Sequence, residues 1–342
     1  MVFSPAMFLP PLRLCLTVTQ PTVARHVMGD LAAAARRAGH PVLFLDISAI
    51  AARSGWAVAR AQIRAFAPDL LLGYGIEPLL PPWTGIASAS DEDPWTLAGV
   101  LPADLPTAGI VCDGDVGLER PAILARLRAA HVHLFCWDRT VLAAARRAGV
   151  RASFLPMAVN ADVFVPPALD APREGIVFIG GPTPARIAAL QRIAAANLPL
   201  EIYGYDGPTW RDAGLSACYG GPVNDRDRLC RIYQRAAVTV NLTRSHGPAS
   251  LPMRIFEALA SGCVVVTDLA EEADRVLGAG IVVEGGEDLV EAIRGILHAP
   301  AERAARSARG RSAILAGHTY GHRIAEILPA LTDLAGRGAQ RR

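Results

Sequence analysis

The segment 240–268 decides the fold of the C-terminal half, and it reads VNLTRSHGPASLPMRIFEALASGCVVVTD. A buried strand that ends near Asn241 leads into a polar loop containing a glycine. A helix follows over 252–260, and Gly262 allows a tight turn into a second strand over 263–267. A strand, a loop, a helix and a parallel strand form the βαβ unit from which doubly wound sheets are built.

The same segment has the residue types of an anion site. Ser250 is placed to cap the helix, whose first N–H groups have no partner within it and therefore suit a phosphate. Arg254 and Glu257 lie three residues apart and share one helix face. A guanidinium can bind phosphate, and a carboxylate can accept hydrogen bonds from two ribose hydroxyls.

Strand and helix patterns alternate through the rest of the chain as well. The expected strands cover 13–19, 41–47, 69–76, 109–112, 131–136, 151–155, 175–179, 200–203, 238–242, 263–267 and 280–283. The expected helices cover 23–37, 56–66, 120–130, 139–147, 184–196, 224–236 with Asn224 as its cap, 252–260, 287–297 and one long basic helix over 302–334. This alternation predicts an α/β protein with two Rossmann-like, doubly wound parallel-sheet domains that face a cleft, which is the default ligand site.

The domain boundaries follow from composition. Residues 1–164 would form the N-terminal domain, and 165–174, rich in proline and small residues, the linker. Residues 175–318 would form the C-terminal domain. Residues 319–342 would return toward the N-terminal domain as a closing helix with a frayed tail.

Composition and missing motifs narrow the function. The 342 residues are 51% hydrophobic, and their net charge of +2 argues against a nucleic-acid partner. No apolar run reaches the ~18 residues of a membrane span. Six cysteines without a C-x-x-C pair favour a reduced, cytoplasmic protein. There is no G-x-G-x-x-G, Walker A or G-x-S-x-G motif for a dinucleotide site, an ATP site or a serine hydrolase.

The phrase MRIFEALASG at 253–262, with Thr267-Asp268 after it, resembles the nucleotide-sugar site of GT-B glycosyltransferases. These residues are similar to those of the CgeB-like, spore-maturation-type branch. That branch is related to the C-terminal domain of glycosyltransferase families 1 and 4. Weaker resemblances at 155–166, 178–186 and 318–323 extend the likeness over about 155–328. The N-terminal half resembles the family only in layout.

The resemblance implies a metal-independent transfer of a sugar from a nucleoside-diphosphate sugar, with the acceptor unknown (a sugar, a lipid-linked sugar or a protein). It implies that Glu257 binds the donor ribose and that Arg254 lies near the diphosphate. The other donor-side residues would be Gly180, Gly181 and Arg186 near the phosphates, Arg244 and Gly247 over the donor sugar, and Asn241 at the strand end.

The sequence departs from the family at one position. Many retaining members carry two glutamates spaced E-x7-E, and Ala249 stands where the first would be. Retaining and inverting chemistry are therefore both open. A sugar-nucleotide epimerase or phosphorylase of the same fold, and a non-catalytic nucleotide-sugar binder, are the alternatives.

The catalytic candidates are Asp113, Asp138 and His26. Asp113 and Asp115 form a D-x-D after an apolar strand, which in GT-A enzymes holds a metal; the alternatives are a turn and an acceptor-side base at Asp113. Asp138 also follows a strand, and His26 begins the first long helix. His318 and His322, four apart on a predicted helix, suit packing or capping better than zinc. Four arginines at 303, 306, 309 and 311 predict a solvated face, or weak peripheral contact with anionic lipid.

Overall fold

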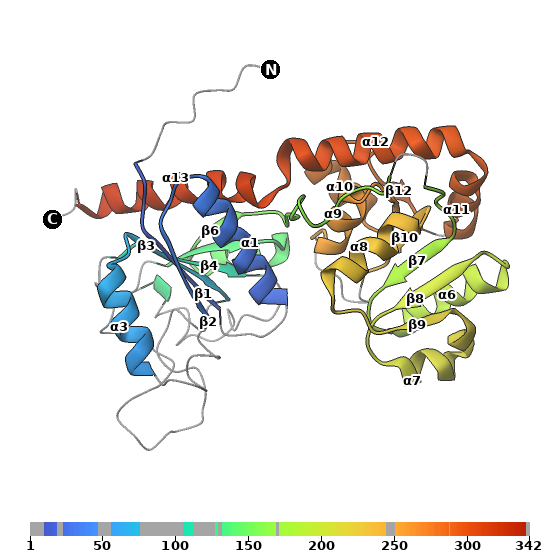
Figure 1. Cartoon of the computed structure of the whole chain (residues 1–342), viewed down its shortest axis with the longest axis horizontal. Helices are drawn as coiled ribbons and strands as arrows, with labels where there is room; N and C mark the ends of the chain where they lie inside the picture. The colour runs from blue at the N-terminus through green and yellow to red at the C-terminus, as the bar shows by residue number, and fades with distance from the viewer. Residues whose placement is uncertain are drawn as a thin grey trace. The chain divides into compact units, whose positions relative to one another are not determined.

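The computed structural model describes residues 10–18, 23–46, 56–75, 105–111, 127–128, 132–168, 171–243, 250–286 and 288–339. The chain divides into two compact units (Figure 1). The first unit consists of Met1–Leu155 together with Tyr320–Arg342, and the second is the continuous segment Pro156–Thr319. None of the helices in these described ranges is both long and apolar enough to cross a membrane.

The first unit is built on a parallel sheet of six strands. Its strands are β1 (Leu14–Val18), β2 (Val42–Asp46), β3 (Leu70–Tyr74), β4 (Thr107–Val111), β5 (His133–Cys136) and β6 (Arg151–Phe154), in the order β2-β1-β3-β4-β5-β6. The helices described with it are α1 (Val23–Arg37), α3 (Trp56–Phe66), α5 (Arg139–Arg147) and the returning α13 (Tyr320–Ala339), which packs against α1. Strands separated by helices thus give the predicted doubly wound layout.

The second unit holds another parallel sheet of six strands. Its strands are β7 (Ile176–Ile179), β8 (Leu200–Tyr203), β9 (Tyr219–Gly221), β10 (Val238–Asn241), β11 (Val264–Thr267) and β12 (Val283–Glu284). Its α-helices are α6 (Pro184–Ala195), α7 (Gly207–Trp210), α8 (Arg226–Arg235), α9 (Met253–Ala260), α10 (Ala270–Leu277), α11 (Leu289–His298) and α12 (Pro300–Gly317). The strand order β12-β11-β10-β7-β8-β9 is that of a dinucleotide-binding Rossmann fold.

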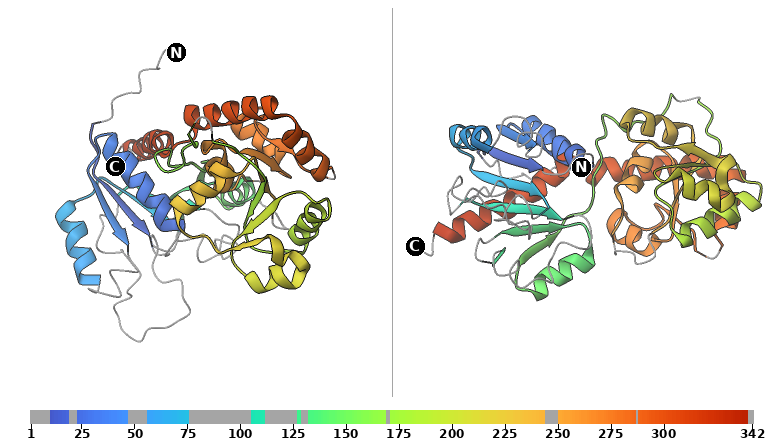
Figure 2. Two further views of the ribbon diagram at one scale, coloured as in Figure 1. Left: turned by 45° about the vertical axis from the view of Figure 1, so that its right-hand side comes forward. Right: turned by 90° about the horizontal axis from the view of Figure 1, so that it is seen from below.

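Alternation of side chains along the strands explains why helices cover both faces of this sheet (Figure 2). Val177 and Val265 point to one face and join a core with α8, α9, α10 and α12. Phe178, Val240 and Val266 point to the other face and join a core with α6, α7 and α11. The central strands β10 and β11 are apolar on both faces because helices bury both sides of them.

The segment expected as a linker belongs structurally to the second unit. Val159 and Phe164 are buried in the core that contains α8 and α9. The carbonyl of Val165 accepts hydrogen bonds from the Cys230 thiol and, at 2.9 Å, from Gln234. The compact unit therefore begins at Pro156, before the predicted linker.

The single basic helix expected over 302–334 is two helices, α12 and α13. Between them, His318 and Thr319 leave the helix, and the backbone of Val159 pairs with them through an N–H···O bond of 3.0 Å to His318. Gly317 ends α12, but the helical prediction continued through it, because the contact with Val159 that accompanies the break comes from a distant part of the sequence. His318 and His322 therefore do not share a helix, and the ring of His318 packs 5.5 Å from that of Phe256.

Other differences are local. The α8 cap is Asp225, whose carboxylate accepts from the Arg228 N–H at 2.7 Å, and not the preceding Asn224. The last strand is shorter and later than the predicted 280–283. Short elements β9, α7 and α10 were not predicted, because three to eight residues carry too little periodicity to show.

Candidate functional site

The topology of the second unit directs attention to one edge of its sheet. The neighbouring strands β7 and β10 are followed by helices on opposite faces, α6 and α9, so the strand order reverses between them. In open α/β sheets ligands bind at the carboxyl ends of the strands beside such a reversal. The residues just after Ile179 and Asn241 are therefore the candidate site.

Helix α9 presents its N-terminus at this edge. The helix begins at Met253, and its N-cap is Pro252, whose side chain cannot accept a hydrogen bond. Ser250 lies two residues too early, so the predicted serine cap does not form. The N-terminal end of α9 carries the positive end of the helix dipole, which favours an anion.

Arg254 reaches from α9 to the end of β7. Its Nη1 donates to the carbonyl of Ile179 at 2.5 Å. A Cβ on Gly180 would lie 2.9 Å from this same Nη1, so a larger residue there would displace the guanidinium. The structure thus brings together Arg254 and Gly180, two of the residues predicted for the phosphate side.

Glu257 lies one turn after Arg254 on α9 and is 4% exposed. Burying a carboxylate is costly unless donors or cations surround it, so an acid here is not an ordinary surface residue. Burial, and then the charge of Glu257, raise the pKa of the Tyr233 phenol well above its ordinary value. The buried face of α9 therefore carries charge next to the candidate site.

Arg186 is also buried, and its guanidinium holds two loops together. Its Nε and Nη2 donate to the carbonyl of Leu242 at 3.0 and 2.7 Å, and its Nη1 donates to the carbonyl of Gly181 at 3.0 Å. Arg186 thus ties the loop after β7 to the end of β10. Arg186 and Leu242 are 56 residues apart in the sequence. No short sequence motif could therefore have predicted this contact.

The ends of β10 and β11 are joined in a similar way. The Asn241 amide donates to the Thr267 hydroxyl at 3.1 Å. The hydroxyl of Thr243 donates to the Asp268 carboxylate at 2.7 Å, and the backbone N–H of Thr243 donates to it at 3.0 Å. Asn241, predicted on the donor side, therefore positions the neighbouring strand end.

Several predicted residues lie outside the described ranges. Arg244, Gly247 and Ala249, the position without the first family glutamate, belong to 244–249. Asp113 and Asp115 belong to 112–126. Gly181 is described, and a Cβ there would have nothing within 4 Å.

Asp138 and His26, the other catalytic candidates, lie in the first unit. Asp138 is 1% exposed and is the N-cap of α5, because its Oδ1 accepts from the N–H groups of Thr140 at 2.6 Å and Val141 at 3.2 Å. Its Oδ2 has no partner among the residues described. His26 is half-buried in the first turns of α1.

The four arginines of α12 are bound within the chain. Arg306 and Arg309 pair with Glu302, at 2.9 and 3.4 Å. Arg311 donates to the carbonyl of Ala260, at the C-terminus of α9, and Arg303 to that of Leu297, at the end of α11. Hydrogen bonds to carbonyls leave the charge of an arginine in place, and Glu302 offsets one of the four charges, so contact with anionic lipid stays a prediction.

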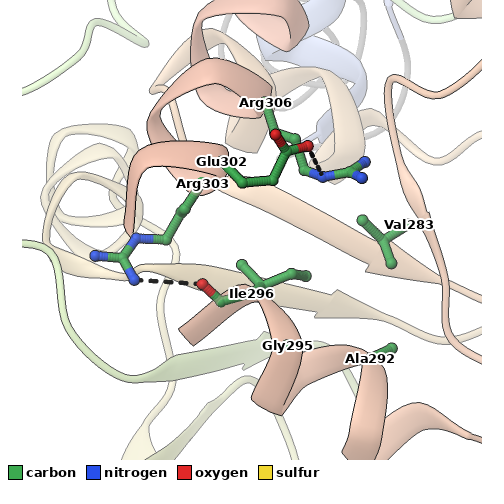
Figure 3. Close-up of a pocket in the computed structure, with 7 residues that line it drawn as sticks. All are labelled: Val283, Ala292, Gly295, Ile296, Glu302, Arg303 and Arg306. Carbon is green, nitrogen blue, oxygen red and sulfur yellow. Dashed lines mark hydrogen bonds and ion pairs between the residues drawn. The ribbon is translucent and has the colours of Figure 1, made fainter. Parts of the chain in front are cut away.

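A pocket of about 240 Å³ lies between α11, the start of α12 and β12 (Figure 3). Figure 3 shows Arg306 turned toward Glu302 and Arg303 toward the Ile296 carbonyl. Because α11 runs antiparallel to the strands, its Gly295–Ile296 end lies away from the carboxyl edge. In the ranges that can be described, no three His, Cys, Asp or Glu side chains gather to hold a metal ion.

Comparison with known proteins adds a family and a fold. Residues 186–329 match the model of a family described as glycosyl transferase-like. None of the curated proteins compared with the chain is a match. Among solved structures, the catalytic domain of starch synthase IV from Arabidopsis thaliana, bound to ADP and acarbose, has a TM-score of 0.57 at 10% identity, covering 96% of this chain and all of that one.

TarM has a TM-score of 0.51 at 13% identity, over 82% of this chain and 58% of its own length. At such identities the likeness concerns the fold alone. Two Rossmann-like units with these neighbours confirm the predicted fold class. The chain has a GT-B-type α/β fold, and its residues 186–329 match a glycosyl transferase-like family.

Proposed function

We propose that the protein transfers a sugar from a nucleoside-diphosphate sugar to an acceptor, and that the carboxyl edge of the second unit binds the donor. The observation that carries this proposal is the pairing of Arg254 with the end of β7. It places a cation, a glycine turn and the N-terminus of α9 at the reversal between β7 and β10. Such a combination stabilises a diphosphate, both when bound and when it leaves.

In this proposal Glu257 accepts hydrogen bonds from the donor ribose, and Arg254 binds the diphosphate. Arg186 is a positioning residue, because its N–H groups hold Gly181 and Leu242. The charge on the leaving diphosphate is balanced by Arg254 and the helix N-terminus without a metal ion. The phrase at 253–262 supports membership in the CgeB-like branch and a hexosyl donor.

The test is equilibrium binding of UDP, GDP, dTDP, CDP and ADP by isothermal titration calorimetry, each with and without Mg²⁺. Glu257→Gln keeps the shape of the side chain but removes its charge. We expect it to weaken the preferred diphosphate by about tenfold or more, since hydrogen bonds to charged groups contribute ~1.5–3 kcal/mol. Glu272→Gln is the matched control, because Glu272 is equally buried, at 4%, but pairs with Arg275 on α10.

Three outcomes would contradict the proposal. Wild-type protein that binds none of the five diphosphates has no donor site of this kind. Equal losses in the two glutamate variants would mean that Glu257 acts only on the fold. Conversion of a sugar nucleotide without any acceptor would replace transfer by epimerisation.

A further inference from the structure

The carboxyl edge continues beyond β7, and there it is built from glycine backbone. Gly204 follows β8, and its N–H donates to the carbonyl of Gly221, the last residue of β9, at 3.1 Å. A side chain on Gly204 would overlap the carbonyl of Gly180, so the strand ends approach closely. A Cβ on Gly181 or Gly221 would have nothing within 4 Å. We call Gly180, Gly181, Gly204 and Gly221 the glycine layer.

Tyr205 stands directly after this glycine layer. It is 60% exposed, the highest value among the large hydrophobic side chains described; the next, Val58, is 41% exposed. Its hydroxyl donates to the Oδ1 of Asn224 at 2.6 Å, and Asn224 lies three residues after β9. An aromatic ring in solvent is thus held by one hydrogen bond across the ends of two strands.

The position of Tyr205 suits the remaining part of a nucleotide. Neighbouring strands lie about 4.8 Å apart. A diphosphate at Arg254 and Gly180 would occupy the end of β7. The ends of β8 and β9 are then one and two strand spacings away, within reach of a base attached to the ribose.

We propose that Tyr205 is the stacking platform for the nucleobase of the donor, and that Asn224 is a positioning residue that fixes the ring. Every nucleobase presents a flat π face, and stacking on an aromatic side chain contributes binding without selecting one base. This inference rests on the proposed function, because it assigns the base of the same donor.

The experiment compares three variants, Tyr205→Leu, Tyr205→Trp and Asn224→Ala, with Leu315→Ala as the control. Leu315 is an exposed apolar residue on α12, 40% exposed and remote from the glycine layer in sequence and topology. The probes are the diphosphate that wild-type protein binds best and ribose 5-phosphate, which has no base. Dissociation constants come from calorimetry, and melting midpoints without ligand check the fold.

We expect Tyr205→Leu to weaken the nucleoside diphosphate by about 5- to 150-fold, the range of one base–aromatic stack. Its affinity for ribose 5-phosphate should stay within about twofold. Tyr205→Trp keeps an aromatic face and should keep the affinity, whereas Asn224→Ala should show a smaller loss than Tyr205→Leu. The melting midpoint should not move, because Tyr205 makes few buried contacts.

Unchanged diphosphate affinity in Tyr205→Leu would overturn the inference while the donor site stands. An equal loss for both probes, or a loss in Tyr205→Trp as large as in Tyr205→Leu, would also overturn it. Failure of wild-type protein to bind any nucleoside diphosphate is the distinct result that removes the proposed function itself.

Discussion

At the carboxyl edge of the second unit, two arginines run from helices to strand ends: Arg186 to Leu242 and Arg254 to Ile179. At the same edge of the first unit, Asp138 hydrogen-bonds the first turn of its own helix, α5, and the exposed Arg25 of α1 pairs with the Asp46 carboxylate at the end of β2, 3.5 Å away. Both sheets are parallel and doubly wound. Among the described residues, the two arginines of the second unit donate to backbone carbonyls at strand ends, whereas Arg25 pairs with a side-chain carboxylate. Layered architecture alone therefore does not distinguish a binding edge; the groups that its arginines hold do.

The largest effect should come from removing the tie between β7 and β10. Arg186→Met leaves the carbonyls of Leu242 and Gly181 without their buried donor, and we expect a loss of about 4 kcal/mol in the stability of the second unit. Hydrogen exchange measured by mass spectrometry on peptides from 171–243 reports that unit alone. Arg192→Met, at an exposed position on the same helix, should stay within ~0.5 kcal/mol. A variant as stable as wild type that no longer binds nucleotide would make Arg186 a ligand and not a tie.

A second comparison uses one glycine at each edge. Gly204 and Gly75 both have positive φ, +145° and +80°, but only a Cβ on Gly204 would meet the backbone of a neighbouring strand end. Gly204→Ala should cost about 3 kcal/mol, from backbone strain and overlap together. Gly75→Ala should cost about 1 kcal/mol from strain alone. Both stability costs are measured by urea unfolding, with hydrogen exchange in peptides of each unit as the readout. Equal costs would show that the close approach of Gly204 to Gly180 has no energetic weight.

Acid should affect the first unit through His133, which is buried in β5. Burial, and then the charges of Arg151 and Arg146, lower the pKa of its imidazole to about 4. In the unfolded chain the pKa is about 6.5. Between pH 6.5 and pH 4 the imidazole is protonated in the unfolded state but not in the folded state. The stabilisation is therefore fully present above pH 6.5 and is lost as the pH falls toward 4.

We expect this group to remove about 2 kcal/mol between pH 7.5 and 4.5. The loss should disappear in His133→Gln and persist in His298→Gln, whose histidine is exposed on α11. Exchange in peptides from 132–155 at several pH values measures it. A pH dependence as large in His133→Gln as in wild type would assign the effect to another group, such as His40, whose pKa is also lowered by burial.

The smallest effect should come from Asp138→Asn. An asparagine oxygen can still accept from the N–H groups of Thr140 and Val141, so stability should change by less than about 1 kcal/mol. We expect the rate of sugar transfer to change less than tenfold, as for a capping residue. A drop of 10²- to 10⁴-fold with intact stability would instead make Asp138 the general base.

The sequence predicted the parts of the fold and the site that depend on local pattern. The apolar run 263–267, the turn at Gly262 and the Arg254–Glu257 spacing on one helix all lie within thirty residues, and β11 and α9 formed as predicted. The role of Arg186 depends on a carbonyl 56 residues away, and the break between α12 and α13 depends on Val159. Tyr205 carried no motif at all. What distinguishes Tyr205 is that its ring is exposed while its hydroxyl bonds to Asn224, beyond the end of the next strand. Both properties depend on the folded structure and cannot be seen in the sequence.

The division of the chain has a consequence for its synthesis. The second unit is one uninterrupted stretch, Pro156–Thr319, whereas the first unit is completed only by α13, with Ile324, Ile327 and Leu331 in its buried face (Figure 1). All residues of the second unit are therefore synthesised before the last helix of the first unit. Until α13 is made, the surface of α1 against which it packs stays exposed. Released chains that are truncated after residue 319 should contain a protease-resistant second unit beside a protease-sensitive first one. The later half of the polypeptide would thus be the earlier to mature.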